Sequence, residues 1–348
     1  MKILALDLGK SKSVGCLLET ATNAAKYVTV KTTPVEIQRL VGRLRPQRVV
    51  LEVGTPAGWV HDVAKGLGVE VQVANPNHEG WRWRNVKRKT DRLDALKLAQ
   101  LSAVDQLPQV HMPSRRVREH RALIGYRCQL VSRRTRIKNT IRSLVHRQGL
   151  TMPPGAEGWT RKSLEELRSW ACPLEEVSPE ATWRGQLQEE LESLAAAESR
   201  LARVEARLDA LGQQDERIRR LQTIPCVGPR TAEMLVAVID DPHRFASGKQ
   251  VASYVGLVPR QYQSGQRDRS GGISKQGHRQ LRRLLVEVSW LALRYNPPLG
   301  GVYLRIRRGS RTRRKIAIVA VARKLLITAW AMLRDGTPWR PGGVELAA

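Results

Sequence analysis

Four carboxylates are the residues whose types and spacing in this sequence best suit chemistry: Asp7, Glu52, Asp91 and Asp94. They stand in a chain of 348 residues that carries 60 Lys plus Arg against 32 Asp plus Glu, a formal net charge of +28. Acidic side chains near basic runs need a reason, and metal coordination beside a phosphodiester supplies one. The set therefore predicts a metal site on a protein that acts on nucleic acid.

The elements around these carboxylates determine whether they can meet. Apolar runs at residues 2–8 and 14–19 predict two strands joined by a turn, with Asp7 at the end of the first strand. A later strand is expected to end near Glu52, and residues 90–103 have apolar side chains at helical spacing. If that helix packs across the strand ends, the four carboxylates converge on one or two Mg²⁺ ions, with Mn²⁺ as the alternative metal.

A solvated ion-pair surface is the simpler interpretation of the Asp-x-x-Asp pair. Lys87, Arg88 and Arg92 are close in sequence and can pair with Asp91 and Asp94 on an exposed helix. For such a pair in isolation this interpretation is favoured. The two further carboxylates at predicted strand ends shift the balance toward a metal site.

The order of the predicted elements indicates the domain organisation and an α/β plus α fold class. Strands alternate with helices at the N-terminal end, with helices expected at 34–44 and 58–66 and a strand at 69–74, which predicts an α/β domain. Two long helices are expected next, at 114–149 and about 180–221. A mainly helical region follows, so the chain divides into four parts: residues 1–110, 111–215, 216–340 and a tail over 341–348.

Leucines at heptad spacing mark the second long helix. They recur every seven residues from Leu187 to Leu208, which is the pattern of a coiled-coil seam. An intramolecular helical hairpin and a dimerising coiled coil fit this pattern equally well. Residues 221–239 add an apolar-x-Gly turn close to a helix-hairpin-helix, whose amides near Val227 and Gly228 either contact DNA phosphates or join two core helices.

Positive charge is concentrated in two stretches. Residues 82–147 hold 18 Lys or Arg against 4 Asp or Glu, and residues 260–340 hold 19 against 3, so the rest of the chain is about neutral. Clustering of this kind is typical of a protein that binds a polyanion. Nucleic acid is the expected partner, and the helices expected from 279–295 and 315–333 belong to this basic region.

Membrane insertion and export are not expected. The longest apolar stretch, 316–333, is interrupted by Arg323 and Lys324, and Asp7 interrupts the first apolar run before a signal peptide can form. The 4 cysteines are far apart without Cys-x-x-Cys pairing, which argues for a reducing compartment and against a zinc ribbon. We expect a cytoplasmic, nucleoid-associated prokaryotic protein.

A basic loop before the predicted Asp-x-x-Asp helix alternates tryptophans with arginines. Aromatic faces can stack on unpaired bases while cationic groups meet phosphates, although one tryptophan can equally well pack in the core. The candidate nucleic-acid contacts here are Trp81, Trp83, Arg84, Lys87 and Arg88.

Two serines lie in a Gly-rich and Arg-rich segment at 253–283. Ser264 and Ser274 can act as nucleophiles if neighbouring cations stabilise the charge that develops on phosphorus, or they can simply bind phosphate oxygens, which chemistry alone favours. The cationic candidates for nucleic-acid contact are Arg267, Arg269, Lys275, Arg279, Arg282 and Arg283.

These motifs together resemble one family. The ordered Asp, Glu and Asp-x-x-Asp set, the loop ending KTDRLDA, the segment IPCVGPRTA and the blocks GLVPRQYQSG and GGISKQGHRQLRR are similar to the Piv/MooV-type insertion-sequence transposases, described as bridge-RNA-guided recombinases. The resemblance covers residues 1 to about 335, and the order and spacing of the motifs are highly specific.

The resemblance implies a fold and a mechanism. It implies a RuvC-like, ribonuclease-H-like domain that carries the tetrad, a coiled-coil region, and a C-terminal transposase domain whose serine forms a phosphoserine intermediate with DNA. The family serine falls in the Ser-Gly step, which selects Ser264 over Ser274. Donor and target DNA, a noncoding guide RNA and a dimeric or tetrameric assembly are the implied partners.

Two other functions are compatible with the same residues. In a metal-dependent junction-resolving nuclease the tetrad would activate water and Ser264 would only bind phosphate. In a non-catalytic DNA-binding or RNA-binding protein the carboxylates would have no role in binding a polyanion.

Overall fold

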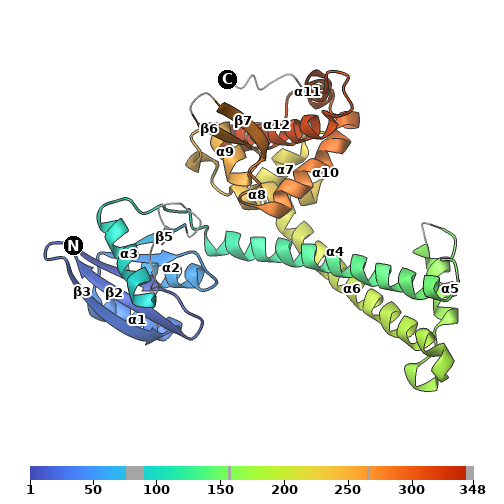
Figure 1. Cartoon of the computed structure of the whole chain (residues 1–348), viewed down its shortest axis with the longest axis horizontal. Coiled ribbons are helices and arrows are strands. Elements are labelled where there is room, and N and C mark those ends of the chain that lie inside the picture. Colours follow the sequence, from blue (N-terminus) through green and yellow to red (C-terminus); the bar gives the residue numbers. More distant parts are fainter. Residues whose placement is uncertain (76–89, 156–157, 265–266, 342–348) are drawn as a thin grey trace. The chain divides into compact units, whose positions relative to one another are not determined.

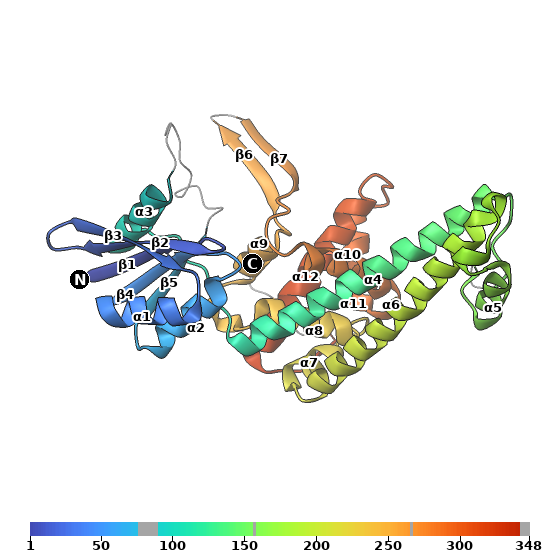
Figure 2. The same cartoon turned by 90° about the horizontal axis from the view of Figure 1, so that it is seen from below.

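The structure is a computed structural model that describes residues 1–75, 90–155, 158–264 and 267–341. The chain forms two compact units, Met1–Arg118 and Glu119–Ala348. Figures 1 and 2 show a sheet with helices in the first unit, and long paired helices with a helical bundle in the second.

The first unit contains a mixed sheet of five strands. The strands are β1 (Lys2–Asp7), β2 (Lys12–Glu19), β3 (Ala24–Lys31), β4 (Arg48–Glu52) and β5 (Glu70–Ala74). Their order in the sheet is β3-β2-β1-β4-β5, with β1, β2 and β3 antiparallel and β1, β4 and β5 parallel. An antiparallel hairpin joined to parallel crossover strands confirms the expected RuvC-like α/β domain.

Helices cover both faces of this sheet. Side chains such as Leu4, Leu6 and Leu51 pack against α1 (Pro34–Leu44) and α2 (Ala57–Gly66) on one face. Ile3, Ala5, Leu18 and Val50 pack against α3 (Asp91–Ala103) on the other. The predicted helices at 34–44, 58–66 and 90–103 are confirmed. Successive strand residues point to opposite faces, so both faces are apolar and the strands read as continuous apolar runs.

Strand β3 was not predicted. It is an edge strand in which most side chains are exposed, and Lys26 and Thr29 interrupt its apolar residues. It pairs with β2 residue by residue from Lys12↔Lys31 to Glu19↔Ala24. Val28 and Val30 pack partly against the core of the sheet, but most side chains of β3 are exposed, so its apolar pattern is weak.

Helix α4 (Arg115–Arg147) is anchored in the first unit by Arg118. The Arg118 guanidinium pairs with Asp62 of α2 and also donates to Pro113 O at 2.6 Å. Burial alone would raise the pKa of Asp62, but hydrogen bonds from Arg118 and His61 hold it below its ordinary value. The first turn of α4 is thereby tied to α2.

In the second unit α4 pairs with α6 (Thr182–Gln213) over most of its length (Figures 1 and 2). Lys138 lies 3.5 Å from Glu198, and Arg127 lies 2.7 Å from Glu205, which makes the two helices antiparallel. The heptad leucines of α6 are buried against α4: Leu187 (0% exposed), Leu194 (2%), Leu201 (4%) and Leu208 (0%). The apolar seam of α6 is therefore buried against α4 of the same chain, as in an intramolecular helical hairpin.

The second long helix is shorter than predicted. It ends at Gln213, and a separate helix, α7 (Glu216–Gln222), follows, so the expectation of one helix to Leu221 was wrong. Asp215 starts α7 by accepting a hydrogen bond from Arg217 N at 3.0 Å. Helix α5 (Arg161–Trp170), at the far end of the pair, was not predicted either.

The C-terminal part of the second unit is a helical bundle with one β-hairpin. Its helices are α7, α8 (Pro229–Ile239), α9 (Gly248–Val255), α10 (Arg279–Tyr295), α11 (Pro297–Arg307) and α12 (Arg314–Asp335). The hairpin is β6 (Pro259–Ser264) with β7 (Arg267–Ile273). The predicted helices at 279–295 and 315–333 are confirmed, whereas α9, α11 and the hairpin were not foreseen.

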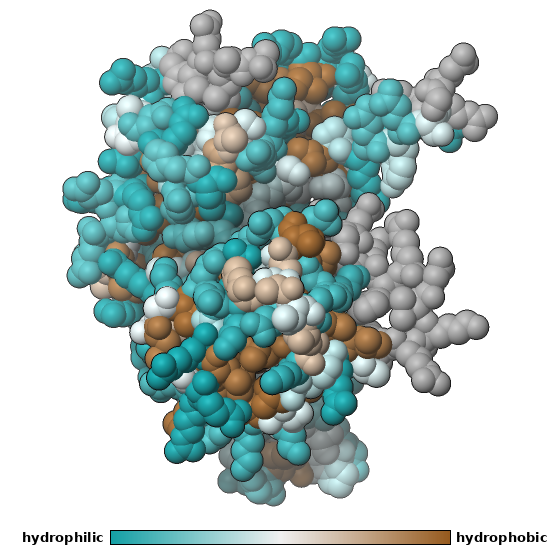
Figure 3. Space-filling model, turned by 90° about the vertical axis from the view of Figure 1, so that its left-hand side faces the viewer, coloured by the Kyte–Doolittle hydropathy of each residue, from teal (hydrophilic) through white to brown (hydrophobic). Residues whose placement is uncertain are grey.

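Two apolar helices form the core of this bundle. Every residue of α8 from Thr231 to Ile239 is buried, and the Val227 amide before it donates to Ile224 O at 2.9 Å. Helix α12 is long and apolar enough to cross a membrane, but 67% of that apolar window is buried inside the protein. It is therefore a core helix, as expected. The face of the molecule that Figure 3 shows is mostly hydrophilic, with separate hydrophobic areas.

Burial of the seam predicts that it stabilises the monomer. Leu194→Ala removes a side chain that is 2% exposed, so the free energy of unfolding is expected to fall by about 2 to 5 kcal/mol. Leu304→Ala, at a leucine 65% exposed on α11, is the matched control and is expected to change it by less than about 0.5 kcal/mol. Urea unfolding measures both.

A seam shared between chains would behave differently. The midpoint of unfolding of the wild-type protein would then rise with protein concentration, because association stabilises the folded state by mass action. A concentration-dependent midpoint that Leu194→Ala abolishes would contradict the intramolecular seam.

Candidate functional site

Two of the four carboxylates stand at the ends of neighbouring parallel strands. Strands β1 and β4 pair in parallel up to Leu6↔Leu51, and the next residue of each is Asp7 and Glu52. Both side chains are half-buried. By strand alternation Asp7 continues the series of Ile3 and Ala5, so it is expected on the face that α3 covers. Glu52, two residues after Val50, is expected on the same face.

Helix α3 brings a third carboxylate to this face. The Thr90 hydroxyl accepts from Leu93 N at 3.3 Å and starts the helix, as an N-cap threonine does. Asp94 is only 9% exposed and belongs to the stripe of Ala95 and Leu98 that packs onto the sheet. A buried carboxylate on an apolar stripe is costly unless it has charged, hydrogen-bonding or metal partners. The position of Asp94 therefore suits coordination of a metal ion.

Asp91 is placed differently from the other three. It is the first residue of α3 and is exposed. Within the described ranges, no group of three or more His, Cys, Asp or Glu side chains is close enough to hold a metal ion. Asp7, Glu52 and Asp94 each take part in other interactions. The fold thus brings the carboxylates to one end of the sheet without assembling a finished ligand cage.

These donors fit a hard divalent cation. All four are carboxylates, which supply the oxygen ligands that Mg²⁺ and Mn²⁺ prefer. The candidate contacts in the preceding basic loop, namely Trp81, Trp83, Arg84, Lys87 and Arg88, lie outside the described residues.

The serine motif forms the exposed β6–β7 hairpin. Every residue of β6 is exposed, and Ser264 is its last residue. Tyr262 pairs with Arg269 and Ser264 pairs with Arg267 in the antiparallel register. Residues directly opposite share one face of a sheet, so Tyr262, Ser264 and Arg269 lie on the same face. The serine thus stands beside an aromatic ring and a guanidinium that both reach solvent.

Ser274 has different surroundings. It follows β7, and its amide donates to Val258 O at 2.8 Å. Its hydroxyl oxygen is buried, with no hydrogen-bond partner among the described residues. Of the two candidate nucleophiles, Ser264 is therefore the exposed one, and the hydroxyl of Ser274 is turned inward.

Arg282 holds the base of the hairpin. It is 9% exposed, and its guanidinium donates to Val255 O and Gln276 O, each at 2.7 Å. Burial and the nearby Arg279 lower the pKa of Arg282. In this structure the side chain joins the end of α9 to the segment before α10. Its described contacts are structural rather than directed toward a nucleic acid.

Two glycines allow the same segment to approach α9 closely. A Cβ on Gly256 would lie 2.1 Å from Gln276 O, and one on Gly277 would lie 1.9 Å from Tyr254 O. Their φ angles are +76° and +72°, a region that favours glycine. The conformation at the hairpin base is fixed by this contact.

The remaining basic candidates surround the start of α10. Lys275 and Arg279 are exposed, and Arg283 pairs with Glu287 at 2.8 Å. His278 starts α10, with Nδ1 accepting from Leu281 N at 3.2 Å. Burial, with Arg121 and Arg282 nearby, lowers the pKa of His278, which keeps Nδ1 free to accept.

Tyr262 was missed in the sequence. It is 63% exposed and two residues from Ser264. In the run 260–264 a glutamine recurs at every second residue, Gln261 and Gln263, which is the period of a strand. That alternation was the available signal for both the hairpin and the tyrosine.

Two family models match this chain. Residues 4–148 match the DEDD_Tnp_IS110 model, described as a transposase, and residues 218–304 match the model for the transposase IS116/IS110/IS902 family. The first match includes all four carboxylates, and the second includes the hairpin with Ser264.

Curated relatives extend over nearly the whole chain. "Probable family 20 transposase" of Pseudomonas aeruginosa is 31% identical over 88% of this chain and 90% of its own length. The transposase for insertion sequence element IS1111A of Coxiella burnetii is 29% identical over 98% and 92%. The pilin gene-inverting protein of Moraxella lacunata is 35% identical over 34% of this chain and 37% of its own.

The family explains why a basic protein has carboxylates at the end of its sheet, since a DEDD nuclease domain works with divalent metal ions. It also explains the excess of positive charge, since a transposase binds DNA. The chain belongs to the IS116/IS110/IS902 transposase family, and it is an enzyme that cleaves and joins DNA with a RuvC-like DEDD domain at its N-terminal end.

Proposed function

We propose that this transposase exchanges DNA strands through a phosphoserine intermediate on Ser264, with Asp7, Glu52, Asp91 and Asp94 as the ligands of Mg²⁺. The observation that carries the metal part is Asp94, a carboxylate buried in the apolar stripe of α3. That stripe packs onto the sheet whose neighbouring strands end in Asp7 and Glu52.

The carboxylates have a defined task in this proposal. Asp7 and Glu52 are held by the sheet and Asp94 by α3, so three ligands rest on rigid elements, and Asp91 completes the set from the exposed start of the helix. A metal ion held by these carboxylates would supply Lewis-acid stabilisation of oxygens at the scissile phosphate. The half-buried site keeps these charges partly away from bulk water, which strengthens their interaction with a cation.

Ser264 has the accessibility that a nucleophile requires. Its Oγ would give up its hydroxyl proton and form a bond to phosphorus while the bond between phosphorus and the departing deoxyribose oxygen breaks, and that oxygen would take up a proton. Arg269 is exposed on the same face of the hairpin and suits a phosphate that carries extra negative charge, and Arg267, the register partner of Ser264, is proposed to help. The covalent ester conserves the phosphodiester energy, so strands can be rejoined without ATP.

Other residues would hold the nucleic acid. Tyr262 offers an exposed ring for stacking on a base beside Ser264, and Lys275, Arg279 and Arg283 are exposed around the start of α10. The tryptophans and cations of the basic loop are proposed to take part. The resemblance to bridge-RNA-guided recombinases supports a noncoding guide RNA as a partner, together with a homo-oligomer acting on the nucleoid of the prokaryotic cytoplasm.

The phosphoserine proposal predicts a covalent protein–DNA adduct. With Mg²⁺, element-end DNA and the RNA that copurifies with the protein, the wild type is expected to form an adduct on a denaturing gel. Ser264→Ala should lower adduct formation by at least about 10⁴-fold, because no other group replaces the nucleophile. Asp94→Asn should abolish it with DNA affinity retained.

Ser274→Ala is the matched control, because this serine is ten residues away in the same motif and has a buried hydroxyl. It should keep the adduct. Cleavage without any adduct that survives Ser264→Ala would instead indicate a hydrolytic nuclease of the junction-resolving kind.

The metal proposal predicts a stability change that needs no DNA. Mn²⁺ is expected to raise the melting temperature of the wild-type protein, because a ligand at a hundredfold excess over its Kd stabilises the folded state by about 2.7 kcal/mol. Asp7→Asn, Glu52→Gln and Asp94→Asn should each remove most of that increase. Thermal denaturation with and without Mn²⁺ measures it.

Asp105→Asn provides the control for lost charge. Asp105 pairs with Arg48 at 3.4 Å, its side chain is 82% exposed, and it is not one of the proposed ligands. This variant should respond to Mn²⁺ like the wild type. An equal loss of response in Asp105→Asn would mean that the cation binds diffusely.

A further inference from the structure

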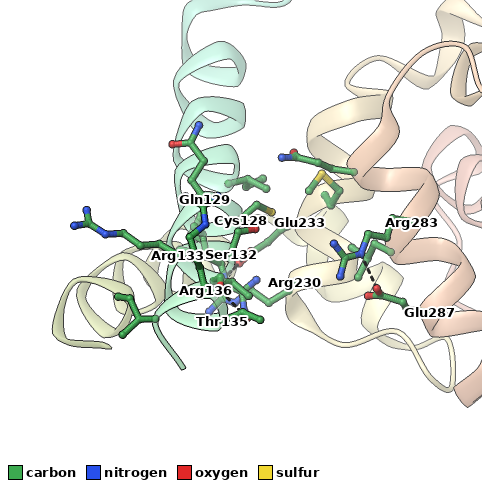
Figure 4. A pocket seen from close by; sticks show the side chains of 18 of the residues that line it. Cys128, Gln129, Ser132, Arg133, Thr135, Arg136, Arg230, Glu233, Arg283 and Glu287 are labelled. Carbon is green, nitrogen blue, oxygen red and sulfur yellow. Dashed lines mark hydrogen bonds and ion pairs between the residues drawn. The ribbon is translucent and has the colours of Figure 1, made fainter. Parts of the chain in front are cut away.

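A groove in the second unit lies between α4 and α10, and none of the residues that line it belongs to the hairpin. It has a volume of about 1060 Å³, and residues of α8 together with Glu190, Ser193 and Leu208 of α6 also line it. Figure 4 shows Cys128, Ser132 and Thr135 on the α4 side and Arg283 with Glu287 on the α10 side. A second hollow of about 640 Å³ continues along α4 and shares Ser132, Thr135, Arg136 and Thr140 with the first.

The α4 side of this surface is a stripe of hydrogen-bonding side chains. We define the α4 stripe as the residues that line the second hollow: Ser132, Thr135, Arg136, Asn139, Thr140, Ser143 and Arg147. The stripe runs along one side of the helix over about 22 Å, at 1.5 Å per residue. It contains hydroxyls, one amide and two guanidiniums, and neither an apolar residue nor a carboxylate.

The arginines of the groove are not all available. Arg127 is paired with Glu205 at 2.7 Å and Arg230 with Glu233 at 2.8 Å, whereas the pair of Arg283 with Glu287 is exposed on both sides and leaves Arg283 able to exchange its partner. In contrast, the structure gives Arg136 and Arg147 of the stripe no carboxylate partner within its described ranges, and both are exposed. Arg136 and Arg147, like the exposed Arg133 of the adjoining groove, are thus not neutralised by a carboxylate of the described residues.

From these observations we propose that the α4 stripe binds the sugar-phosphate backbone of a nucleic acid. Arginine, serine, threonine and asparagine are the side chains that contact phosphates and sugars in protein–nucleic acid complexes. A protein partner would require an apolar centre, which the stripe lacks. The contacts go to the backbone, so they position the strand without reading its sequence.

The hydroxyls suit this role because they can both donate and accept. Thr135 Oγ1 donates to Val131 O at 3.0 Å and Thr140 Oγ1 donates to Arg136 O at 3.2 Å, so each is held against the helix. Rotation of the hydroxyl hydrogen would let either donate to a phosphate oxygen instead. DNA and RNA share this backbone chemistry, and the 2′-hydroxyl of RNA would add a further partner.

Removing the two unpaired arginines tests the proposal. Arg136→Ala with Arg147→Ala is expected to weaken binding about tenfold, and to lower the slope of log affinity against log salt by about 1.8 for duplex DNA or about 1.4 for single-stranded RNA. A random-sequence duplex DNA and a random-sequence single-stranded RNA are the two probes. Binding is measured by fluorescence anisotropy without divalent metal, so neither Ser264 nor the carboxylates enter the result.

The matched control has the same loss of charge. Arg200→Ala with Arg203→Ala removes two exposed arginines of α6 that line neither hollow. A change confined to duplex DNA assigns the stripe to a DNA backbone, and one confined to RNA assigns it to an RNA backbone. If the stripe variant matches the control on both probes, the proposal is overturned.

Conservative variants separate the stripe from a folding defect. Arg136→Lys with Arg147→Lys keeps both charges and should retain most of the affinity and the salt slope. Ser132→Ala with Ser143→Ala keeps the charge and removes two exposed hydroxyls, so it should weaken binding severalfold with the slope unchanged. Wild-type affinity in this hydroxyl variant would contradict contact along the stripe. Adduct formation remains a separate measurement.

Discussion

The parallel register of β1 and β4 is the constraint on which the candidate metal site depends. Four side chains of these strands face α1 and α2 and are each 0% exposed: Leu4, Leu6, Val49 and Leu51. A slip of one residue would turn this apolar set to the other face. The same register brings Asp7 and Glu52 to one end of the sheet, so packing forces that have no catalytic role place the carboxylates.

The hairpin that carries Ser264 relies on a different principle. Its strands are exposed and gain little from burial, so its orientation must come from its base. There Arg282 joins Val255 and Gln276, and the close approach at Gly256 and Gly277 fixes the backbone. A rigid base with an exposed tip lets a nucleophile reach a phosphate outside the protein surface.

The elements that could be predicted from sequence are those whose residues are buried on a regular period. Helix α1 was predicted with its observed bounds, and the order of four carboxylates along strand, strand and helix pointed to the RuvC-like domain. Strand β3 was missed because most of its side chains are exposed, and the β6–β7 hairpin was missed because its residues are mainly polar. The pairing of both depends on backbone partners. The α4 stripe has the helical period too, but in polar residues, which a search for apolar patterns passes over.

Helix α4 combines two requirements in one element. One side of the helix is buried through Ile137, Ile141 and Leu144, and the side chains of the opposite side do not pack in the core. Its 33 residues include many arginines and a single acidic residue, Glu119. Repulsion among these charges opposes folding, and the ion pairs to Glu198 and Glu205 relieve it on the side that faces α6. The positive charges on the polar side repel one another in the free protein, and a polyanion bound there, as proposed, would lower this repulsion further than dissolved ions do.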